Sequence, residues 1–309
     1  MDKILIIKIG ALGDVLRTTA ILPALKGEVT WVTQKSSFPL LAQNPFIKKI
    51  VDVDEGYLLR EEYRLILNLD EEPKALKLAM MLKKKELIGA YMDESSGGAA
   101  YTESSASWFD MGLISRLGKK AANVKKWENQ RSYQEIIFGM VGKKFNGEEF
   151  ILPVLPKAHP APEGQEIVGL ETRSGDRWVG KRWSRFPELI ELLKAEKIRR
   201  VKFKTFPTLE EFIQHINSTD WVVTTDSLAL HVALALKKKV VALFTCTSWQ
   251  EIYGYGRMEK IVSPLLEKYF YNTTKEALKS GEAIEPTRVF EALIRICKQP
   301  QTHRAGVPT

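Results

Sequence analysis

The chain has 309 residues, of which 44% are apolar and 27% charged, values typical of a globular enzyme rather than a disordered or collagenous protein. Two cysteines imply no disulfide framework, and the longest apolar runs, such as residues 240–244, are too short to span a membrane. The net charge of +8 favours anionic partners, but no zinc spacing or recognition-helix motif is present, so we expect no nucleic acid partner.

Strand-like and helix-like patterns alternate along the first half of the chain. Strands are expected at residues 3–9, 29–32, 50–53, 65–69 and 86–89, and helices at 14–25, 73–81 and 133–141. The strands are short and apolar, which is typical of parallel strands that are buried on both faces.

The first apolar strand is followed by a loop that carries a candidate catalytic residue. Gly10 and Gly13 permit a tight turn and the close approach of another molecule, and Asp14 follows them directly. Open α/β sheets bind ligands at the carboxyl ends of their strands, where this carboxylate is expected. A carboxylate there also stabilises a helix start by roughly 0.3–1 kcal/mol, and the two roles are compatible. Residues 70–72, before Pro73, predict a helix-capping cluster.

A proline-rich stretch at residues 153–164 divides the pattern in two, and we place the domain boundary at residue 156. The alternation restarts beyond it, and the polar tail 299–309 is expected to be frayed. Strands are expected at 167–170, 201–203, 221–224 and 240–244, and helices at 187–195, 208–216, 227–236 and 286–297. The sequence predicts two doubly wound α/β domains, at residues 1–156 and 157–298, with a binding cleft between them.

The loop after the strand at 167–170 is rich in cations: Arg173, Arg177, Lys181 and Arg182 are interspersed with glycines. Charged side chains at the carboxyl end of a strand can hold a diphosphate through charge-assisted hydrogen bonds. The alternative is a solvated basic loop whose tryptophans are anchored on the core.

A second loop has ligand-binding character at Thr224–Ser227, where a strand ends and a helix begins. The N–H groups of that helix start and its positive dipole would face a ligand, and His231 lies about one turn further on, on the side that can point at it. Asp226 or Thr225 could equally be a helix cap, and a lone histidine on an apolar helix is more often part of the core.

Three segments together resemble glycosyltransferase family 9, the ADP-heptose:lipopolysaccharide heptosyltransferases. They are residues 8–20, residues 175–183, and residues 224–231 with 240–244. The resemblance implies a glycosyltransferase-B fold, in which two Rossmann-like domains face each other across a cleft. It implies an inverting transferase without metal or cofactor, with the sugar nucleotide mainly on the C-terminal domain and the acceptor on the N-terminal one.

The resemblance also implies roles for individual residues. Asp14 corresponds to the general base that takes a proton from the acceptor hydroxyl, and Lys181 to the cation that neutralises the departing diphosphate. The residues expected to bind the donor sugar and its phosphates are Thr172, Arg173, Arg182, Thr225, Asp226, Ser227 and His231. Gly13 and Arg17 are expected on the acceptor side.

The chain departs from the family pattern in its second half. Between residues 195 and 208 the family usually has a strand, a glycine-rich loop and a further helix, but this segment is shortened and has no glycine. Thr245–Thr247 replace the common Gly-Pro-Thr, and Arg173 and Ser174 stand where small residues usually let phosphate approach.

Two functions follow from this combination. The first is a working transferase that moves heptose or a similar sugar from an ADP-heptose-like donor to a glycan or lipopolysaccharide-core-type acceptor. The second is a non-catalytic relative with a degenerate donor site that binds a glycan or a partner protein. The N-terminus lacks a signal-peptide pattern, so we expect a cytoplasmic protein, and four of the five lysine clusters precede residue 150, which predicts peripheral contact with an anionic membrane.

Overall fold

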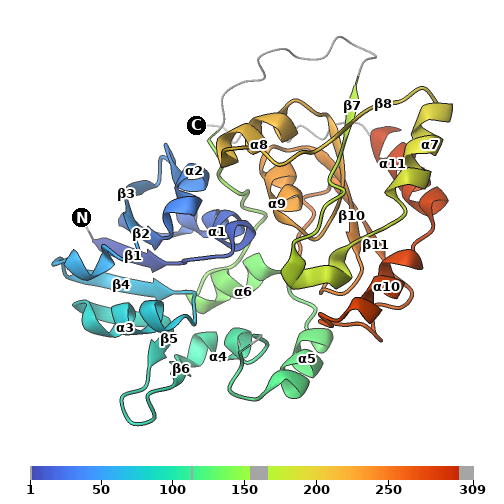
Figure 1. Ribbon diagram of the computed structural model, residues 1–309. Helices are drawn as coiled ribbons and strands as arrows, with labels where there is room; N and C mark the ends of the chain where they lie inside the picture. Colours follow the sequence, from blue (N-terminus) through green and yellow to red (C-terminus); the bar gives the residue numbers. More distant parts are fainter. Residues whose placement is uncertain (1, 113, 154–165, 299–309) are drawn as a thin grey trace. The chain divides into compact units, whose positions relative to one another are not determined.

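The structure is a computed structural model that describes residues 2–112, 114–153 and 166–298. It forms two compact units, one of residues 1–154 with 250–253 and one of residues 155–249 with 254–309 (Figure 1). The predicted boundary at residue 156 and the predicted frayed tail lie outside the described residues, so both stay predictions.

The N-terminal unit is built on a sheet with the strand order β3-β2-β1-β4-β5-β6, in which only β6 is antiparallel. The strands are β1 (Lys3–Ile7), β2 (Glu28–Thr33), β3 (Ile47–Asp52), β4 (Tyr63–Asn68), β5 (Lys84–Met92) and β6 (Ala99–Tyr101). The helices are α1 (Leu12–Thr18), α2 (Phe38–Leu41), α3 (Pro73–Met81), α4 (Glu103–Phe109), α5 (Lys119–Glu128) and α6 (Tyr133–Met140). From β1, the sheet continues through β2 and β3 on one side. On the other side it continues through β4 and β5, so the topological switch point lies between β1 and β4.

The C-terminal unit has an all-parallel sheet with the strand order β11-β10-β9-β7-β8. The strands are β7 (Ile167–Leu170), β8 (Arg199–Lys202), β9 (Trp221–Thr225), β10 (Lys239–Phe244) and β11 (Met258–Val262). The helices are α7 (Phe186–Ala195), α8 (Leu209–Asn217), α9 (Leu228–Ala235), α10 (Leu278–Glu282) and α11 (Pro286–Lys298). Here the order reverses between β7 and β9, which is the place where doubly wound sheets bind ligands.

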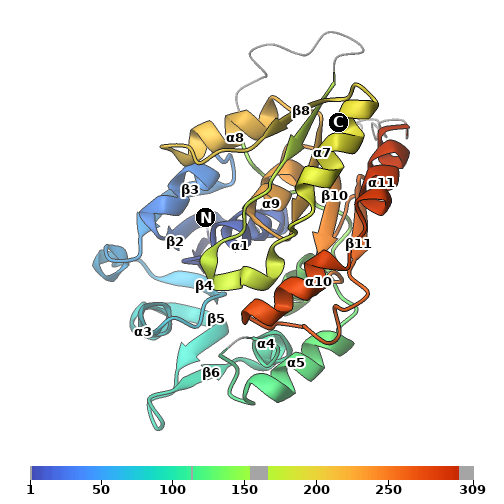
Figure 2. The same cartoon turned by 45° about the vertical axis from the view of Figure 1, so that its right-hand side comes forward.

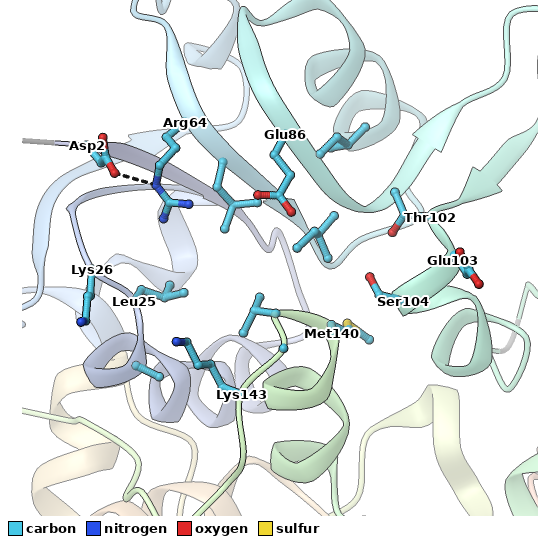
Figure 3. Close-up of a pocket in the computed structure, with 16 residues that line it drawn as sticks. Asp2, Leu25, Lys26, Arg64, Glu86, Thr102, Glu103, Ser104, Met140 and Lys143 are labelled. Carbon is cyan, nitrogen blue, oxygen red and sulfur yellow. Dashed lines mark ion pairs between the residues drawn. The ribbon is translucent and has the colours of Figure 1, made fainter.

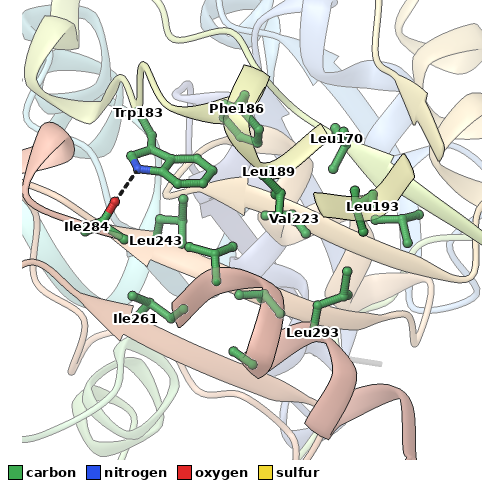
Figure 4. Packing of buried hydrophobic residues seen from close by; sticks show 14 of the residues in the cluster. Leu170, Trp183, Phe186, Leu189, Leu193, Val223, Leu243, Ile261, Ile284 and Leu293 are labelled. Carbon is green, nitrogen blue, oxygen red and sulfur yellow. Dashed lines mark hydrogen bonds between the residues drawn. The ribbon is translucent and has the colours of Figure 1, made fainter. Parts of the chain in front are cut away.

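Helices cover both faces of the C-terminal sheet, with α7 and α11 on one side and α8 and α9 on the other (Figure 2). The core beneath α7 and α11 joins side chains of both helices to β7, β9, β10 and β11 (Figure 4). Trp183 is buried in this core, and its indole N–H donates to the carbonyl of Ile284 at 3.1 Å. The residue that ends the basic loop is therefore fixed on the core.

The predicted fold class is confirmed, since both units are α/β and their sheets are parallel except for β6 at the edge of the N-terminal sheet. The first predicted helix is shorter than expected, because α1 ends at Thr18 and a 3-10 helix (Thr19–Ala24) follows. The sequence pattern missed β6, which has three residues, and β11, where Glu259 and Lys260 interrupt the apolar pattern of an edge strand. None of the described helices is long and apolar enough to cross a membrane.

Candidate active site

Asp14 lies in the first turn of α1, directly after the loop that leaves β1, and its side chain is 37% exposed. The carboxylate pairs with the guanidinium of Arg17 one turn later, with 2.9 Å between Oδ1 and Nη2. The predicted position at the carboxyl end of the first strand is therefore correct, and the carboxylate is both accessible to solvent and oriented by a cation.

Arg17, which the family pattern assigns to the acceptor side, is buried except for 8% of its surface. Its guanidinium carbon lies 3.9 Å from the centroid of the Tyr133 ring and 6.0 Å from that of Trp108. The Tyr133 hydroxyl lies 2.6 Å from the Thr18 hydroxyl, which itself donates to the Asp14 carbonyl. Arg17 thus connects Asp14 to an aromatic wall, and its contact with an acceptor stays a prediction.

Asp70, at the end of β4, fastens the loop that precedes Asp14. Its Oδ2 atom accepts from the N–H groups of Ile9 and Gly10, at 2.9 and 3.4 Å, and from the ammonium of Lys8 at 3.1 Å. Burial opposes the charged form of Lys8, but Asp70 and Asp14 outweigh it, so the pKa of Lys8 is raised above its ordinary value. The buried Lys8 ammonium is therefore held near Asp14, on the side of the loop that faces the end of β4.

This role corrects the interpretation of residues 70–72 as a helix-capping cluster. The N-cap of α3 is Glu72, and its side chain makes no capping hydrogen bond. Asp70 instead crosses the switch point from β4 to the β1–α1 loop. Sequence reasoning missed this because the partners are about sixty residues apart and become neighbours only once the strand order is known.

We expect Asp70→Asn to destabilise the N-terminal unit by about 3–5 kcal/mol, because it leaves the buried Lys8 ammonium without its counter-charge. The double variant Lys8→Met/Asp70→Asn should recover part of this loss, since both members of the pair are then neutral. Urea unfolding followed by tryptophan fluorescence measures the difference.

The matched control is Lys74→Gln, which breaks the exposed pair between Lys74 and Asp54 and should cost less than about 1 kcal/mol. If Asp70→Asn is no more destabilising than this control, Asp70 does not secure the loop.

In the C-terminal unit, Lys181 and four of the predicted donor residues lie at the switch point between β7 and β9: Thr225, Asp226, Ser227 and His231. The basic loop follows β7 and ends in a 3-10 helix (Asp176–Lys181), while Asp226 and Ser227 follow β9. Thr245–Thr247 follow the next strand, β10. The carboxyl ends of β7, β9 and β10 therefore contribute to one cluster. The sequence predicted ligand-binding loops after β7 and β9.

Lys181 and Asp226 form the centre of this cluster, with 2.8 Å between Nζ and Oδ2. Their side chains are 20% and 15% exposed, so the pair is shielded but reachable. Burial would raise the pKa of Asp226, but Lys181, His231 and a hydrogen bond from Thr247 lower it well below its ordinary value. The carboxylate is thus ionised at any physiological pH and fixes the direction of the Lys181 ammonium.

His231 is buried in α9, with its Nε2 atom 4.0 Å from Oδ1 of Asp226. The histidine is therefore a buried residue of α9 that also lies near Asp226, and its contact with a donor stays a prediction. The cap of α9 is Ser227, without a side-chain capping bond, and not Asp226 or Thr225. The Thr225 hydroxyl is buried and makes no hydrogen bond to any of the described residues.

The end of the basic loop is held by close packing around Gly180. A Cβ at this position would lie 2.7 Å from Cβ of Ala277 and 3.0 Å from the Asn272 carbonyl. The Gly180 carbonyl accepts from the Thr245 hydroxyl at 2.7 Å. Trp183 is also buried, so Lys181 lies between two residues whose positions are fixed by packing, Gly180 and Trp183.

Arg173 has a different environment from the one the sequence suggested. Its guanidinium forms two hydrogen bonds, 2.8 and 2.7 Å long, with the nearly buried carboxylate of Glu171 and a third with Thr205. To bind phosphate, the guanidinium would have to leave these partners, so this role stays a prediction. Arg182 is exposed, and Thr172 lies between Glu171 and Arg173 in the loop.

A pocket of about 960 Å³ opens elsewhere, at the amino ends of β1, β4 and β5 in the N-terminal unit (Figure 3). Its lining includes the ion pair of Asp2 and Arg64, together with Glu86 and Lys143. None of the predicted site residues lines it, and ligands of doubly wound sheets bind at the opposite, carboxyl edge. We therefore do not place the predicted ligand site in this pocket.

Comparison with known proteins relates part of the sequence to a known family. The family model of glycosyltransferase family 9 (heptosyltransferase) matches residues 178–279, a stretch that contains Lys181, Asp226 and His231 but not Asp14. No curated protein matches the sequence.

Three solved structures resemble the whole chain at low sequence identity. A family 9 glycosyl transferase from Veillonella parvula is 15% identical with a TM-score of 0.67, covering 96% of this chain and 98% of its own. Heptosyltransferase WaaC of E. coli, solved with ADP, is 14% identical with a TM-score of 0.60, covering 95% and 99%. ADP-heptose lps heptosyltransferase II of E. coli is 14% identical with a TM-score of 0.61, covering 95% and 98%. The resemblance to glycosyltransferase family 9 is therefore confirmed, by sequence over residues 178–279 and by fold over nearly the whole chain.

Proposed function

We propose that this protein is an inverting glycosyltransferase that uses a nucleoside diphosphate sugar as donor. The observation that carries the proposal is the Lys181–Asp226 pair, held at the switch point of a heptosyltransferase-like fold. A sugar transfer to an acceptor hydroxyl needs positive charge where the diphosphate leaves and a base where the hydroxyl loses its proton.

Lys181 supplies the positive charge. One of its three N–H groups is directed at Asp226, which leaves the ammonium two further donors for the diphosphate oxygens. Asp226 cannot act as an acid because its pKa is lowered, so its role is to orient Lys181 and to accept hydrogen bonds from hydroxyls of the donor sugar. Thr225, Ser227 and His231 are neighbours of this pair and complete the proposed donor site.

Asp14 supplies the base. Its carboxylate takes the proton of the acceptor hydroxyl while the hydroxyl oxygen forms a bond to the anomeric carbon. The bond from that carbon to the diphosphate breaks in the same displacement, and the electron pair leaves with the diphosphate facing Lys181. A single displacement inverts the configuration at the anomeric carbon, and since Lys181 neutralises the leaving group, the proposed reaction uses no metal ion or cofactor.

The donor and acceptor are proposed by analogy with proteins of the same fold. WaaC is solved with ADP, and the dodecameric heptosyltransferase TibC with ADP-D-beta-D-heptose. We propose an ADP-heptose-like donor, a glycan or lipopolysaccharide-core-type acceptor, and a cytoplasmic site of action.

Isothermal titration with ADP, UDP, GDP and CDP tests the proposal, because a donor site should bind one diphosphate far better than the others. We expect ADP to bind with a micromolar dissociation constant, about −8 kcal/mol in binding free energy. Product analysis with an ADP-sugar and a glycan acceptor should then give the inverted anomer in the presence of a chelator. If no nucleotide binds at millimolar concentration, the transferase proposal fails and a non-catalytic, glycan- or partner-binding protein takes its place.

A further inference from the structure

We propose that residues 114–127 form a surface, here called the α5 surface, that docks on anionic lipid. The inference goes beyond the proposed sugar transfer and does not depend on it. It gives a location to the membrane contact that the charge distribution predicts.

The α5 surface concentrates exposed apolar side chains. Among the described residues, eight large apolar side chains are exposed, and four of them lie within this stretch of fourteen residues: Ile114, Leu117, Val124 and Trp127, at 65, 42, 52 and 36%. The remaining four are distributed over residues 46, 58, 81 and 253. A concentration of this kind on a protein surface marks an interaction site.

The same surface carries cations between its apolar side chains. Lys119, Lys120 and Lys125 are exposed, and the first turn of α5 contains no acidic residue. Two lysines in the first turn of a helix oppose the helix dipole and so cost stability. Their placement is explained if the surface meets an anionic partner, because the lysine charges and the partial positive charge of the helix N-terminus then attract the same partner.

Buried contacts on the inner side of the α5 surface hold its backbone in place. On the inner side of α5, the buried Lys126 pairs with Glu251 at 2.8 Å and lies over the Trp108 ring. Before the helix, the Ser115 hydroxyl accepts from the N–H of Leu117 and donates to the Asp110 carbonyl. Figures 1 and 2 show α5 next to α4, on the side of the N-terminal unit away from β3.

Lipid is the occupant that this chemistry fits best. Lysines interspersed with aliphatic side chains and a tryptophan match the boundary between headgroups and acyl chains, where tryptophan is favoured and each lysine is attracted to anionic headgroups. A protein interface would instead be expected to have few lysines, which are depleted there.

Vesicle sedimentation tests the inference with the full chain and no nucleotide. We expect binding to phosphatidylcholine vesicles that contain about one third phosphatidylglycerol, weaker binding at about 0.15 M salt, and none to phosphatidylcholine alone. The variant Lys119→Gln/Lys120→Gln/Lys125→Gln should lower the partition coefficient by about two orders of magnitude, roughly fivefold for each lysine. Trp127→Ala should also lower the partition coefficient relative to the wild type, both at low salt and at about 0.15 M salt.

The matched control is Lys83→Gln/Lys85→Gln/Lys144→Gln, which removes the same charge from exposed positions of the same unit. Retained binding by the α5 variant, an equal loss in the control, or no binding by the wild type would each overturn the inference. A wild-type dimer that Trp127→Ala dissociates would also overturn it, because the occupant would then be a second copy. The α5 variants should bind nucleotide as the wild type does, so failure here is distinguishable from failure of the transferase proposal.

Discussion

Replacing Asp14 by asparagine should lower the turnover number by about two to four orders of magnitude, the contribution of a positioned general base. Asparagine keeps the size of the side chain and an oxygen that can accept from Arg17, so α1 and its contact with Tyr133 should persist. It cannot take the proton of the acceptor hydroxyl, which is why the loss should fall on the chemical step. Steady-state kinetics at saturating donor measures it.

A structural role for Asp14 would give a different result, because a carboxylate in the first turn of a helix also favours the helix dipole by roughly 0.3–1 kcal/mol. The control is Glu103→Gln, which removes an exposed first-turn carboxylate from α4 of the same unit and should leave turnover unchanged. Asp14→Asn should also bind nucleotide with wild-type affinity. Full turnover by Asp14→Asn would remove Asp14 from the mechanism.

The N-terminal unit shows what could be inferred from the sequence near Asp14 and what could not. The apolar run before Gly10 places the strand, and the carboxylate after it, because both depend on local pattern alone. The partners that secure this loop depend on strand order. Asp70 reaches the β1–α1 loop only because β4 pairs with β1, and Tyr133 lies against Arg17 from a helix more than a hundred residues away. No local pattern carries this information.

In the C-terminal unit, the sequence likewise indicates the kind of site but not the partners of each charged side chain. The glycines and cations of the basic loop indicate an anion site, but the sequence does not say which cation is available. The guanidinium of Arg173 pairs with Glu171, two residues earlier in the same loop. Lys181, at the other end of the loop, pairs with Asp226 after β9. The shortened segment after residue 195 still forms β8, next to β7, so the sheet keeps its switch point.

Lys181 is the second residue whose replacement should have a large effect. Lys181→Met should reduce turnover by about two to three orders of magnitude, comparable to the loss of one preorganised donor to a developing negative charge. It should also weaken nucleoside diphosphate binding more than monophosphate binding, because the ammonium is proposed to face the outer phosphate. Kinetics together with titrations of ADP and AMP measure both effects.

Lys181→Met also leaves the Asp226 carboxylate without its strongest partner, so part of any loss could come from a rearranged loop. Lys181→Arg separates the two causes, since it keeps the charge against Asp226 while changing the donor geometry. It should retain the stability of the wild type and recover much of the ADP affinity. Lys194→Met, an exposed lysine on α7, controls for net charge in the same unit. If Lys181→Met binds ADP and AMP with unchanged affinity while unfolding normally, the leaving-group cation must be sought elsewhere in the loop, and the exposed Arg182 is the next residue to replace.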